Sequence, residues 1–360
     1  MIAIARATAF DILMAVEKGG YASELLLART ADLDSRDAGL AEEIVFGVLR
    51  YRGSLDYLIE HYSGRPARQL DAEVAGALRI GIYQLRYLDR IPAHAAVGES
   101  VELIKRARKR SAAGFANAVL RKVDRKPVDW PDDAARLSHP AWLLDRWSRT
   151  FGSAQAESIA LANLSAPIAY ERDGRIQDIG SQSIVPLLRL ASGQTFLDLC
   201  AAPGNKTAQA LETRVEAIAC DLHPHRLRTL KPFGIPLVAL DGTRPLPFAR
   251  KFDRILVDVP CSGTGTLARN PEIKWKLNPS DLADLQGRQT ALLENALEVL
   301  APGGMLVYST CSLEGEENED VIAKVAENRP IEVIETMHRL PGRDPGDGFF
   351  ASVIKFHKAP

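Results

Sequence analysis

The chain has 360 residues, which leaves room for about two domains. Charged residues make up 25% of the chain, hydrophobic residues 46%, and the net charge is −1, which excludes a uniformly basic nucleic-acid binder. Residues 1–10 lack the features of a secretion signal, and no apolar run is long enough to span a membrane. The four cysteines have neither metal-site nor disulfide-framework spacing, so we expect a cytoplasmic protein with free thiols and no metal.

The first third of the sequence has helical periodicity. From Ile2 to about Val123, apolar residues recur three and four positions apart, and no strand-like run interrupts them. The expected breaks between helices are Gly19-Gly20, Gly53-Ser54, Ser63-Gly64-Arg65-Pro66 and Ile91-Pro92. We therefore predict an all-α domain over residues 1–126 and a helical connector over residues 127–166.

A basic cluster lies near the end of this helical region. Its members are Lys105, Arg106, Arg108, Lys109 and Arg110. A cluster of this kind is equally consistent with a solvated helix face and with phosphate contacts to a nucleic acid.

From about residue 167 onward, short apolar runs alternate with helical segments. The expected strands are Thr195–Leu199, Ala217–Cys220, Pro236–Leu240, Arg254–Val257 and Met305–Tyr308. Helical segments such as Lys206–Glu212 and Leu282–Leu300 separate them, which predicts a doubly wound, mostly parallel α/β sheet. Residues 348–356 alternate between apolar and polar and are expected to add an edge strand.

Ligands of such sheets bind at the carboxyl ends of the strands. The first strand runs into Asp198-Leu-Cys-Ala-Ala-Pro-Gly-Asn-Lys-Thr207, whose small residues allow close approach of a ligand to the backbone. Asp221 ends the second strand, where a carboxylate suits the ribose of S-adenosylmethionine or of a nicotinamide dinucleotide. Asp241 follows the third and suits either an adenine amine or a simple exposed turn. The candidate cofactor-binding residues are Cys200, Ala201, Ala202, Pro203, Gly204, Asn205, Lys206, Asp221, Asp241 and Asp258.

Two cysteines follow later strands in polar, loop-forming sequence. Cys261 lies in Asp258-Val-Pro-Cys-Ser-Gly-Thr-Gly265, and Cys311 lies in Ser309-Thr-Cys-Ser312. Cys220, inside a strand, is better explained by packing. Cysteine is a good covalent catalyst because its thiol ionises near neutral pH, so Cys261 and Cys311 are candidate catalytic residues together with Asp258. The residues alone do not say which thiol attacks.

These segments together resemble the Nol1/Nop2/Sun family of RNA 5-methylcytosine methyltransferases (RsmB/Fmu type). The matching segments are Asp198–Thr207, Asp258–Thr266 with Asn270–Trp275, Ser309–Ser312 with Glu316–Glu319, and Gln177-Asp178 with Ser181-Gln182. The helical first third resembles the RNA-binding fold of the antitermination factor NusB. The resemblance implies an all-α NusB-like helical domain followed, over residues 167–360, by an α/β Rossmann-like class I methyltransferase domain with a mostly parallel sheet.

The resemblance also implies an activity and its residues. The expected reaction transfers a methyl group from S-adenosyl-L-methionine to carbon 5 of a cytosine in RNA, with 16S rRNA or a small-subunit precursor as the partner. In that family pattern Cys311 is the nucleophile and Cys261 releases the covalent adduct. Such an addition needs charge control at N3 of the base, and Asp258, three residues before Cys261, is expected to supply it or to contact the cofactor. A monomer is expected.

The sequence departs from the family pattern at two places. Asn205 stands where a second glycine is usual, which predicts an unusual backbone angle there that asparagine tolerates. In addition, only about a dozen residues, 163–175, replace a small RNA-binding subdomain, so RNA is expected to be held differently.

Three other functions remain open from the sequence. A nicotinamide-dependent oxidoreductase would use the same sheet and Asp221, but the glycine-rich G-x-G-x-x-G loop is missing. A non-catalytic RNA-binding or ribosome-assembly factor that retains cofactor binding would fit the shortened segment. A DNA cytosine methyltransferase would use the cysteine of the Pro-Cys pair, Cys261, as its nucleophile.

Overall fold

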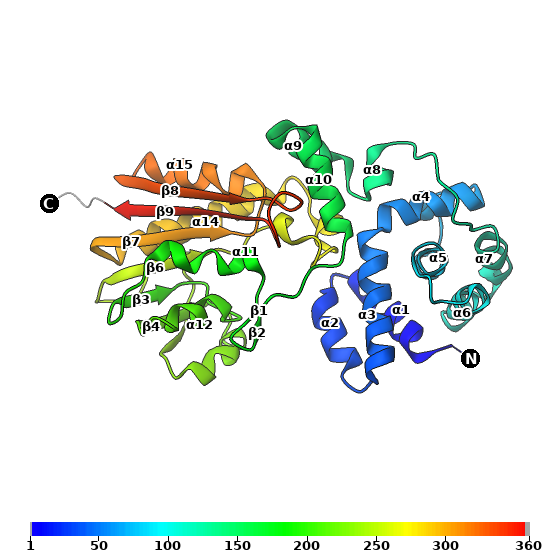
Figure 1. Cartoon of the computed structure of the whole chain (residues 1–360), viewed down its shortest axis with the longest axis horizontal. Helices are drawn as coiled ribbons and strands as arrows, with labels where there is room; N and C mark the ends of the chain where they lie inside the picture. The colour runs from blue at the N-terminus through cyan, green and yellow to red at the C-terminus, as the bar shows by residue number, and fades with distance from the viewer. Residues whose placement is uncertain (1, 357–360) are drawn as a thin grey trace. The chain divides into compact units, whose positions relative to one another are not determined.

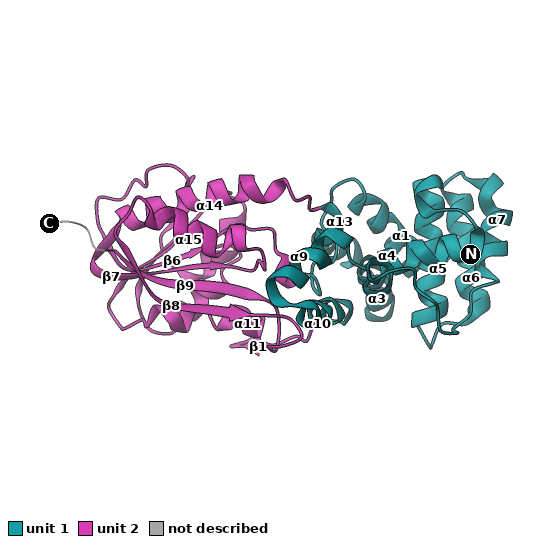
Figure 2. Ribbon diagram, turned by 90° about the horizontal axis from the view of Figure 1, so that it is seen from above, with its two compact units in different colours: residues 1–166, 267–276 teal, residues 167–266, 277–360 magenta. Residues whose placement is uncertain are grey.

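The computed structural model describes residues 2–356, and the chain divides into two compact units (Figures 1 and 2). The helical unit contains residues 1–166 and 267–276, and the sheet unit contains residues 167–266 and 277–360. Within the described range, no helix is both long and apolar enough to cross a membrane.

The helical unit confirms the expected all-α fold. Its first helices surround α5, eleven of whose sixteen residues are buried. The helices are α1 Ile4–Val16, α2 Ala22–Thr30, α3 Ser35–Arg50, α4 Arg52–Ser63, α5 Ala72–Tyr87, α6 Ala93–Arg106, α7 Ala113–Leu120, α8 Asp133–Leu137, α9 Ala141–Phe151 and α10 Ser153–Leu164. At Gly47 the helices α3 and α5 touch, because a Cβ atom there would lie 2.0 Å from the Tyr83 ring. Glycine therefore permits the close helix contact.

One predicted helix break is wrong. Gly53-Ser54 lies inside α4, and the chain turns one residue after α3, at Tyr51. Gly53 is present because the helix packs closely there: its N–H donates to Ser138 Oγ, and an added Cβ would lie 3.2 Å from the Ser138 Cα. The glycine marks tertiary contact rather than a helix end.

The segment 267–276, which contains the short helix α13 Ile273–Lys276, belongs to the helical unit (Figure 2). Glu272 accepts a hydrogen bond from Ala22 N, and Trp275 Nε1 donates to Leu49 O. Lys274 is almost fully buried, and its Nζ donates to Arg50 O. These side chains fasten the segment to helices more than two hundred residues earlier in the chain.

The sheet unit has a seven-stranded, mostly parallel sheet in the order β5-β4-β3-β6-β7-β9-β8. Its strands are β3 Thr195–Asp198, β4 Glu216–Asp221, β5 Leu237–Ala239, β6 Phe252–Asp258, β7 Leu300–Thr310, β8 Ile331–Arg339 and β9 Phe349–Phe356. The five strands from β3 to β7 pair in parallel, which confirms the predicted class of fold.

Successive strand residues pack on opposite faces of the sheet, as a period of two requires. Phe196 and Leu256 face one core, with Ile184 and Leu188 of the segment before β3. The neighbouring strand residues face the other core, which is closed by α14 Asp281–Glu298 and α15 Glu319–Ala326. The sheet therefore lies between two layers, as a doubly wound fold does (Figure 1).

The tail strand is not at the edge of the sheet. β9 pairs antiparallel with β7 on one side and with β8 on the other, so β8 is the edge. The prediction of an edge strand for residues 348–356 is wrong, because Ile331–Arg339, which the sequence pattern does not mark as a strand, takes that position. β9 is buried along most of its length, as an internal strand must be.

The stretch of chain between α10 and the first strand of the sheet forms only short elements. A two-stranded hairpin, β1 Glu171–Arg172 with β2 Arg175–Ile176, is followed by the short helices α11 Ile179–Gln182 and η3 Val185–Leu188.

Candidate active site

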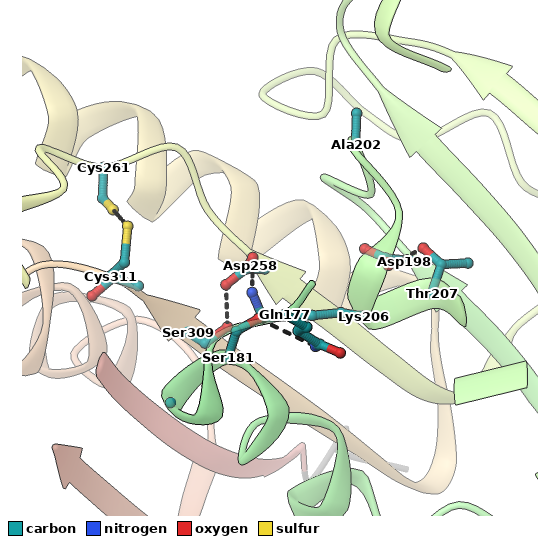
Figure 3. A network of polar contacts seen from close by, with 12 residues as sticks. Gln177, Ser181, Asp198, Ala202, Lys206, Thr207, Asp258, Cys261, Ser309 and Cys311 are labelled. Atoms are coloured by element: carbon teal, nitrogen blue, oxygen red, sulfur yellow. Dashed lines mark hydrogen bonds and ion pairs between the residues drawn. The ribbon is translucent and has the colours of Figure 1, made fainter. Parts of the chain in front are cut away.

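The predicted loops meet at one edge of the sheet, because β3, β4, β6 and β7 run parallel and end there. Figure 3 shows Asp198, Lys206, Asp258 and the pair Cys261 and Cys311 around this edge. A pocket opens beside the first loop, and its lining residues are Ser181, Asp198, Cys200, Ala201, Ala202, Pro203, Gly204, Asn205, Lys206 and Asp258.

Asp198 is the buried acid of this pocket, at the end of β3. Its Oδ2 accepts a hydrogen bond of 2.6 Å from Thr207 Oγ1, while its Oδ1 has no hydrogen-bond partner among the described residues. Burial raises the pKa of the carboxyl to about 7, against the lowering effect of Thr207. A buried acceptor without a donor fits a ligand that brings a cationic donor, such as the amino group of S-adenosylmethionine.

Asn205, which stands where the family usually has a second glycine, has no strained backbone angle. Gly204 is the residue with positive φ (109°), and a Cβ atom there would lie 2.8 Å from Leu230. Asn205 instead begins α12 Asn205–Leu211 and donates through Nδ2 to Ile176 O. The expectation of an unusual angle at Asn205 is wrong, because the left-handed turn is completed one residue earlier.

Asp221 and Asp241 lie in different settings. Asp221 is buried at the end of β4, and its Oδ2 lies 3.4 Å from Ala202 N in the pocket loop. Asp241 is exposed, and its Oδ1 accepts from both N and Oγ1 of Thr243. Asp241 thus closes its own turn, and these hydrogen bonds lower the pKa of its carboxyl.

Asp258 is held by two donors at the end of β6. Lys206 Nζ lies 2.6 Å from its Oδ2, and Ser309 Oγ donates to its Oδ1 at 2.7 Å (Figure 3). Burial acts to lower the pKa of Lys206, but the charge of Asp258 outweighs it and the pKa is raised. Lys206 is therefore a fixed cation within the site.

The two candidate thiols lie side by side. Asp258 and Ser309 are register partners on β6 and β7, so Cys261 and Cys311, three and two residues further on, are brought together. Their Sγ atoms are 3.3 Å apart. The hydrogen bond with Cys311 is the largest of several effects, burial among them, that raise the pKa of Cys261 well above its usual value. Cys261 is thus suited to keep its proton.

The loop that carries Cys261 is locked against the Cys311 loop by backbone contact. Gly265 N donates to Cys311 O at 2.8 Å, and Gly348 N donates to Gly265 O at 2.8 Å. A Cβ atom at Gly265 would lie 2.4 Å from Gly348 O. Only glycine allows the three backbone segments to approach this closely.

The other two cysteines are separate from this pair. Cys220 is fully buried in β4, and burial raises the pKa of its thiol to about 12. Cys200 lines the pocket, and burial raises the pKa of its thiol well above the usual range. Neither thiol is set up for ionisation.

The basic cluster is largely engaged within the helical unit. Lys105 pairs with Glu102, Arg106 with Asp11, and Lys109 with Asp71. Arg108 has positive φ and Arg110 begins a short 3-10 helix. RNA contact by these residues remains a prediction.

Several residues around the site were not singled out from the sequence. Ser309 and Thr207 each donate to a site carboxylate, and Ser181 lines the pocket. All three lie in segments that resemble family motifs, so the sequence offered a signal for each of them. Among residues 2–356 there is no cluster of three or more histidine, cysteine or acidic side chains that could hold a metal ion.

Comparison with known proteins relates both units to characterised families. Residues 185–355 match the family model "16S rRNA methyltransferase RsmB/F", and residues 3–125 match the NusB family. The proteins named ribosomal RNA small subunit methyltransferase B of Citrobacter koseri and Escherichia coli O1:K1 are each 32% identical, with 94% of this chain and 96% of the relative covered. Each alignment spans 412 positions, more than the 360 residues here, so both relatives have residues without a counterpart in this chain.

Solved structures agree on the fold. The crystal structure of PH0851 aligns with a TM-score of 0.80 at 19% identity, with 99% of both chains covered. A methyltransferase homologue from Pyrococcus horikoshii aligns with a TM-score of 0.54 at 25% identity, with 62% of this chain and 97% of that chain covered.

Proposed function

The chain belongs to the 16S rRNA methyltransferase RsmB/F family, and on that premise we propose that it methylates carbon 5 of a cytosine in 16S rRNA through a covalent bond to Cys311. The coarser activity follows from the family: the chain is an S-adenosylmethionine-dependent rRNA methyltransferase. The observation that carries the finer proposal is the Cys261–Cys311 pair, 3.3 Å apart beside the Lys206–Asp258 ion pair.

The cofactor pocket would be the loop after β3. The backbone of residues 200–204 would lie against the cofactor, Asp221 would accept from its ribose, and Asp198 would face its cationic end. Asp241 is the proposed partner of the adenine amine, through its Oδ2, which accepts neither of the Thr243 hydrogen bonds. When bound, S-adenosylmethionine supplies an electrophilic methyl group.

Carbon 5 of cytosine is too weak a nucleophile to accept that methyl unaided. We propose that the Cys311 thiolate adds to carbon 6, which forms an S–C6 bond and moves electron density onto carbon 5. After methylation the proton on carbon 5 passes to solvent. The electron pair of the C5–H bond restores the C5–C6 double bond, and the S–C6 bond breaks to release the Cys311 thiolate. The target base must be unpaired or flipped out for carbon 6 to be reached.

The surroundings favour Cys311 as the attacking residue. The raised pKa of Cys261 makes it the natural proton donor to a Cys311 thiolate at 3.3 Å. Cys261 would then protonate the Cys311 thiolate as the adduct resolves. Asp258, held by Lys206 and Ser309, would control charge at N3 of the base.

The test is direct. The purified chain should transfer labelled methyl from S-adenosylmethionine to 16S rRNA, and nucleoside analysis should find the label in 5-methylcytidine, with 23S rRNA as the control. If the chain binds S-adenosylhomocysteine but produces no 5-methylcytidine on naked 16S rRNA or on small-subunit precursors, the alternative of a non-catalytic assembly factor is favoured. The short segment between α10 and α11 supports this alternative, because a small RNA-binding subdomain is expected there in the family pattern.

A further inference from the structure

A buried carboxylate lies between the loops of the two cysteines. Glu317, in the short 3-10 helix η6 Gly315–Glu317, is fully buried. Its Oε1 accepts from Ser262 N at 2.8 Å, and its Oε2 accepts from the hydroxyls of Ser262 and Ser312. Ser262 directly follows Cys261, and Ser312 directly follows Cys311. One side chain therefore binds the residue next to each thiol.

Glu317 is itself fixed from two further directions. Gln289 of α14 donates to its Oε1 at 2.9 Å and to Pro260 O at 3.0 Å. The Tyr308 hydroxyl of β7 donates to the Glu317 backbone carbonyl at 2.6 Å. The carboxylate thus accepts four hydrogen bonds, and such charge-assisted bonds to buried groups are strong and directional.

We propose that Glu317 is a positioning residue whose carboxylate sets the spacing of Cys261 and Cys311. The proposal rests on the proposed function, in which the two thiols act in successive steps on the same cytosine base. None of the described residues that line the cofactor pocket is among the hydrogen-bond partners of the Glu317 carboxylate, which lie in the loops after β6 and β7 and on α14. Its loss should therefore impair the cysteine steps and leave cofactor binding intact.

Glu317→Gln is the conservative test, because it keeps the shape of the side chain but replaces one of the two acceptor oxygens by a donor. The matched control is Glu327→Gln, at the exposed end of α15. We expect Glu317→Gln to lower kcat at least about tenfold. The affinity for S-adenosylhomocysteine should stay within about twofold, because the pocket is unaltered. A variant that merely has a smaller folded fraction would bind S-adenosylhomocysteine with a lower stoichiometry at unchanged affinity, so kcat is calculated per cofactor-binding site.

A second readout measures the thiol spacing without any methylation. Phenylarsine oxide condenses with two neighbouring thiols, forming two As–S bonds and releasing one water, so its affinity reports whether both sulfurs are within bridging distance. The wild-type chain should bind it tightly, Cys261→Ala should not form the bridge, and Glu317→Gln should bind at least about tenfold more weakly.

Ser262→Ala provides an independent variant should Glu317→Gln fold poorly. It removes one hydroxyl donor and leaves Glu317 in place, so a smaller loss in both readouts is expected. The chain that carries both Ser262→Ala and Glu317→Gln should be no slower than Glu317→Gln alone, because both changes remove the hydrogen bond between Ser262 and Glu317.

The outcomes separate the two proposals. Unchanged kcat and unchanged arsenical affinity in Glu317→Gln would overturn the positioning role, whereas Glu327→Gln should match the wild type in both. If the wild-type chain makes no 5-methylcytidine while Glu317→Gln still weakens the arsenical bridge, the proposed function fails and the role of Glu317 in the thiol spacing stands.

Discussion

Replacement of Asp198 by asparagine should remove a large part of the pH dependence of the sheet unit's stability. In the unfolded chain this carboxyl titrates near its ordinary pKa of 3.8, and in the folded chain its pKa is raised to about 7 by burial. Between these values the unfolded state has released a proton that the folded state keeps. The contribution of Asp198 to stability therefore falls as the pH rises from about 4 to about 7, and it is constant above that range.

The raised pKa sets the size of the effect. A shift of about three pKa units corresponds to about 4 kcal/mol, at about 1.4 kcal/mol per unit, as an upper limit. An asparagine side chain cannot ionise, so Asp198→Asn should lose this slope and be the more stable chain at pH 8. The same change should weaken binding of S-adenosylhomocysteine, because the neutral amide cannot attract the cationic end of the ligand.

Hydrogen exchange can measure this change in the sheet unit, which contains Asp198. All four tryptophans (Trp130, Trp142, Trp147, Trp275) lie in the helical unit, so their fluorescence follows that unit alone. Exchange of the amides of β3, corrected for intrinsic rates, reports opening of the sheet unit. Equal pH slopes in wild type and Asp198→Asn, measured on β3, would refute the reasoning.

Three further substitutions test the backbone contacts and the charge burial described above. Gly265→Ala should destabilise the sheet unit by about 1–3 kcal/mol and abolish methyl transfer, because its Cβ would lie 2.4 Å from Gly348 O and 2.8 Å from Cys311 O. Gly287→Ala on α14, with open space around it, should be neutral or stabilising by up to about 1 kcal/mol, and equal denaturation midpoints for the two variants would contradict this account. Lys274 is buried, which lowers its pKa well below the usual value of 10.5, so the unfolded state binds more protons and stability should rise with pH toward that value. Lys274→Met should flatten that rise in the tryptophan-monitored transition, and an unchanged slope would show that the burial argument is wrong.

Much of the fold was predictable because its signals are local. The strands β3 to β7 were expected from short apolar runs, and a parallel sheet brings their carboxyl ends to one edge whatever its strand order. The strand β8 escaped prediction because an edge strand needs no buried face: its residues are exposed or only partly buried. The wrong placement of β9 at the edge followed from that omission.

The site was predictable as a set of segments but not as a geometry. The contact of Cys261 with Cys311 depends on the register that pairs Asp258 with Ser309, and no local pattern sets a register between strands so far apart in the chain. Glu317 is one of three glutamates in the segment Glu316–Glu319, and only the 3-10 turn buries it between the loops. The attachment of residues 267–276 to the helical unit likewise depends on contacts between distant parts of the chain.

The covalent role of Cys311 is the central claim, and trapping the adduct tests it most directly. Cys261→Ala, incubated with S-adenosylmethionine and 16S rRNA, should accumulate a protein–RNA complex that survives denaturing electrophoresis, and Cys311→Ala should form neither complex nor 5-methylcytidine. Peptide mapping of the complex should place the RNA on Cys311. Normal turnover by Cys311→Ala, or an adduct mapped to Cys261 in the wild-type chain, would contradict the claim.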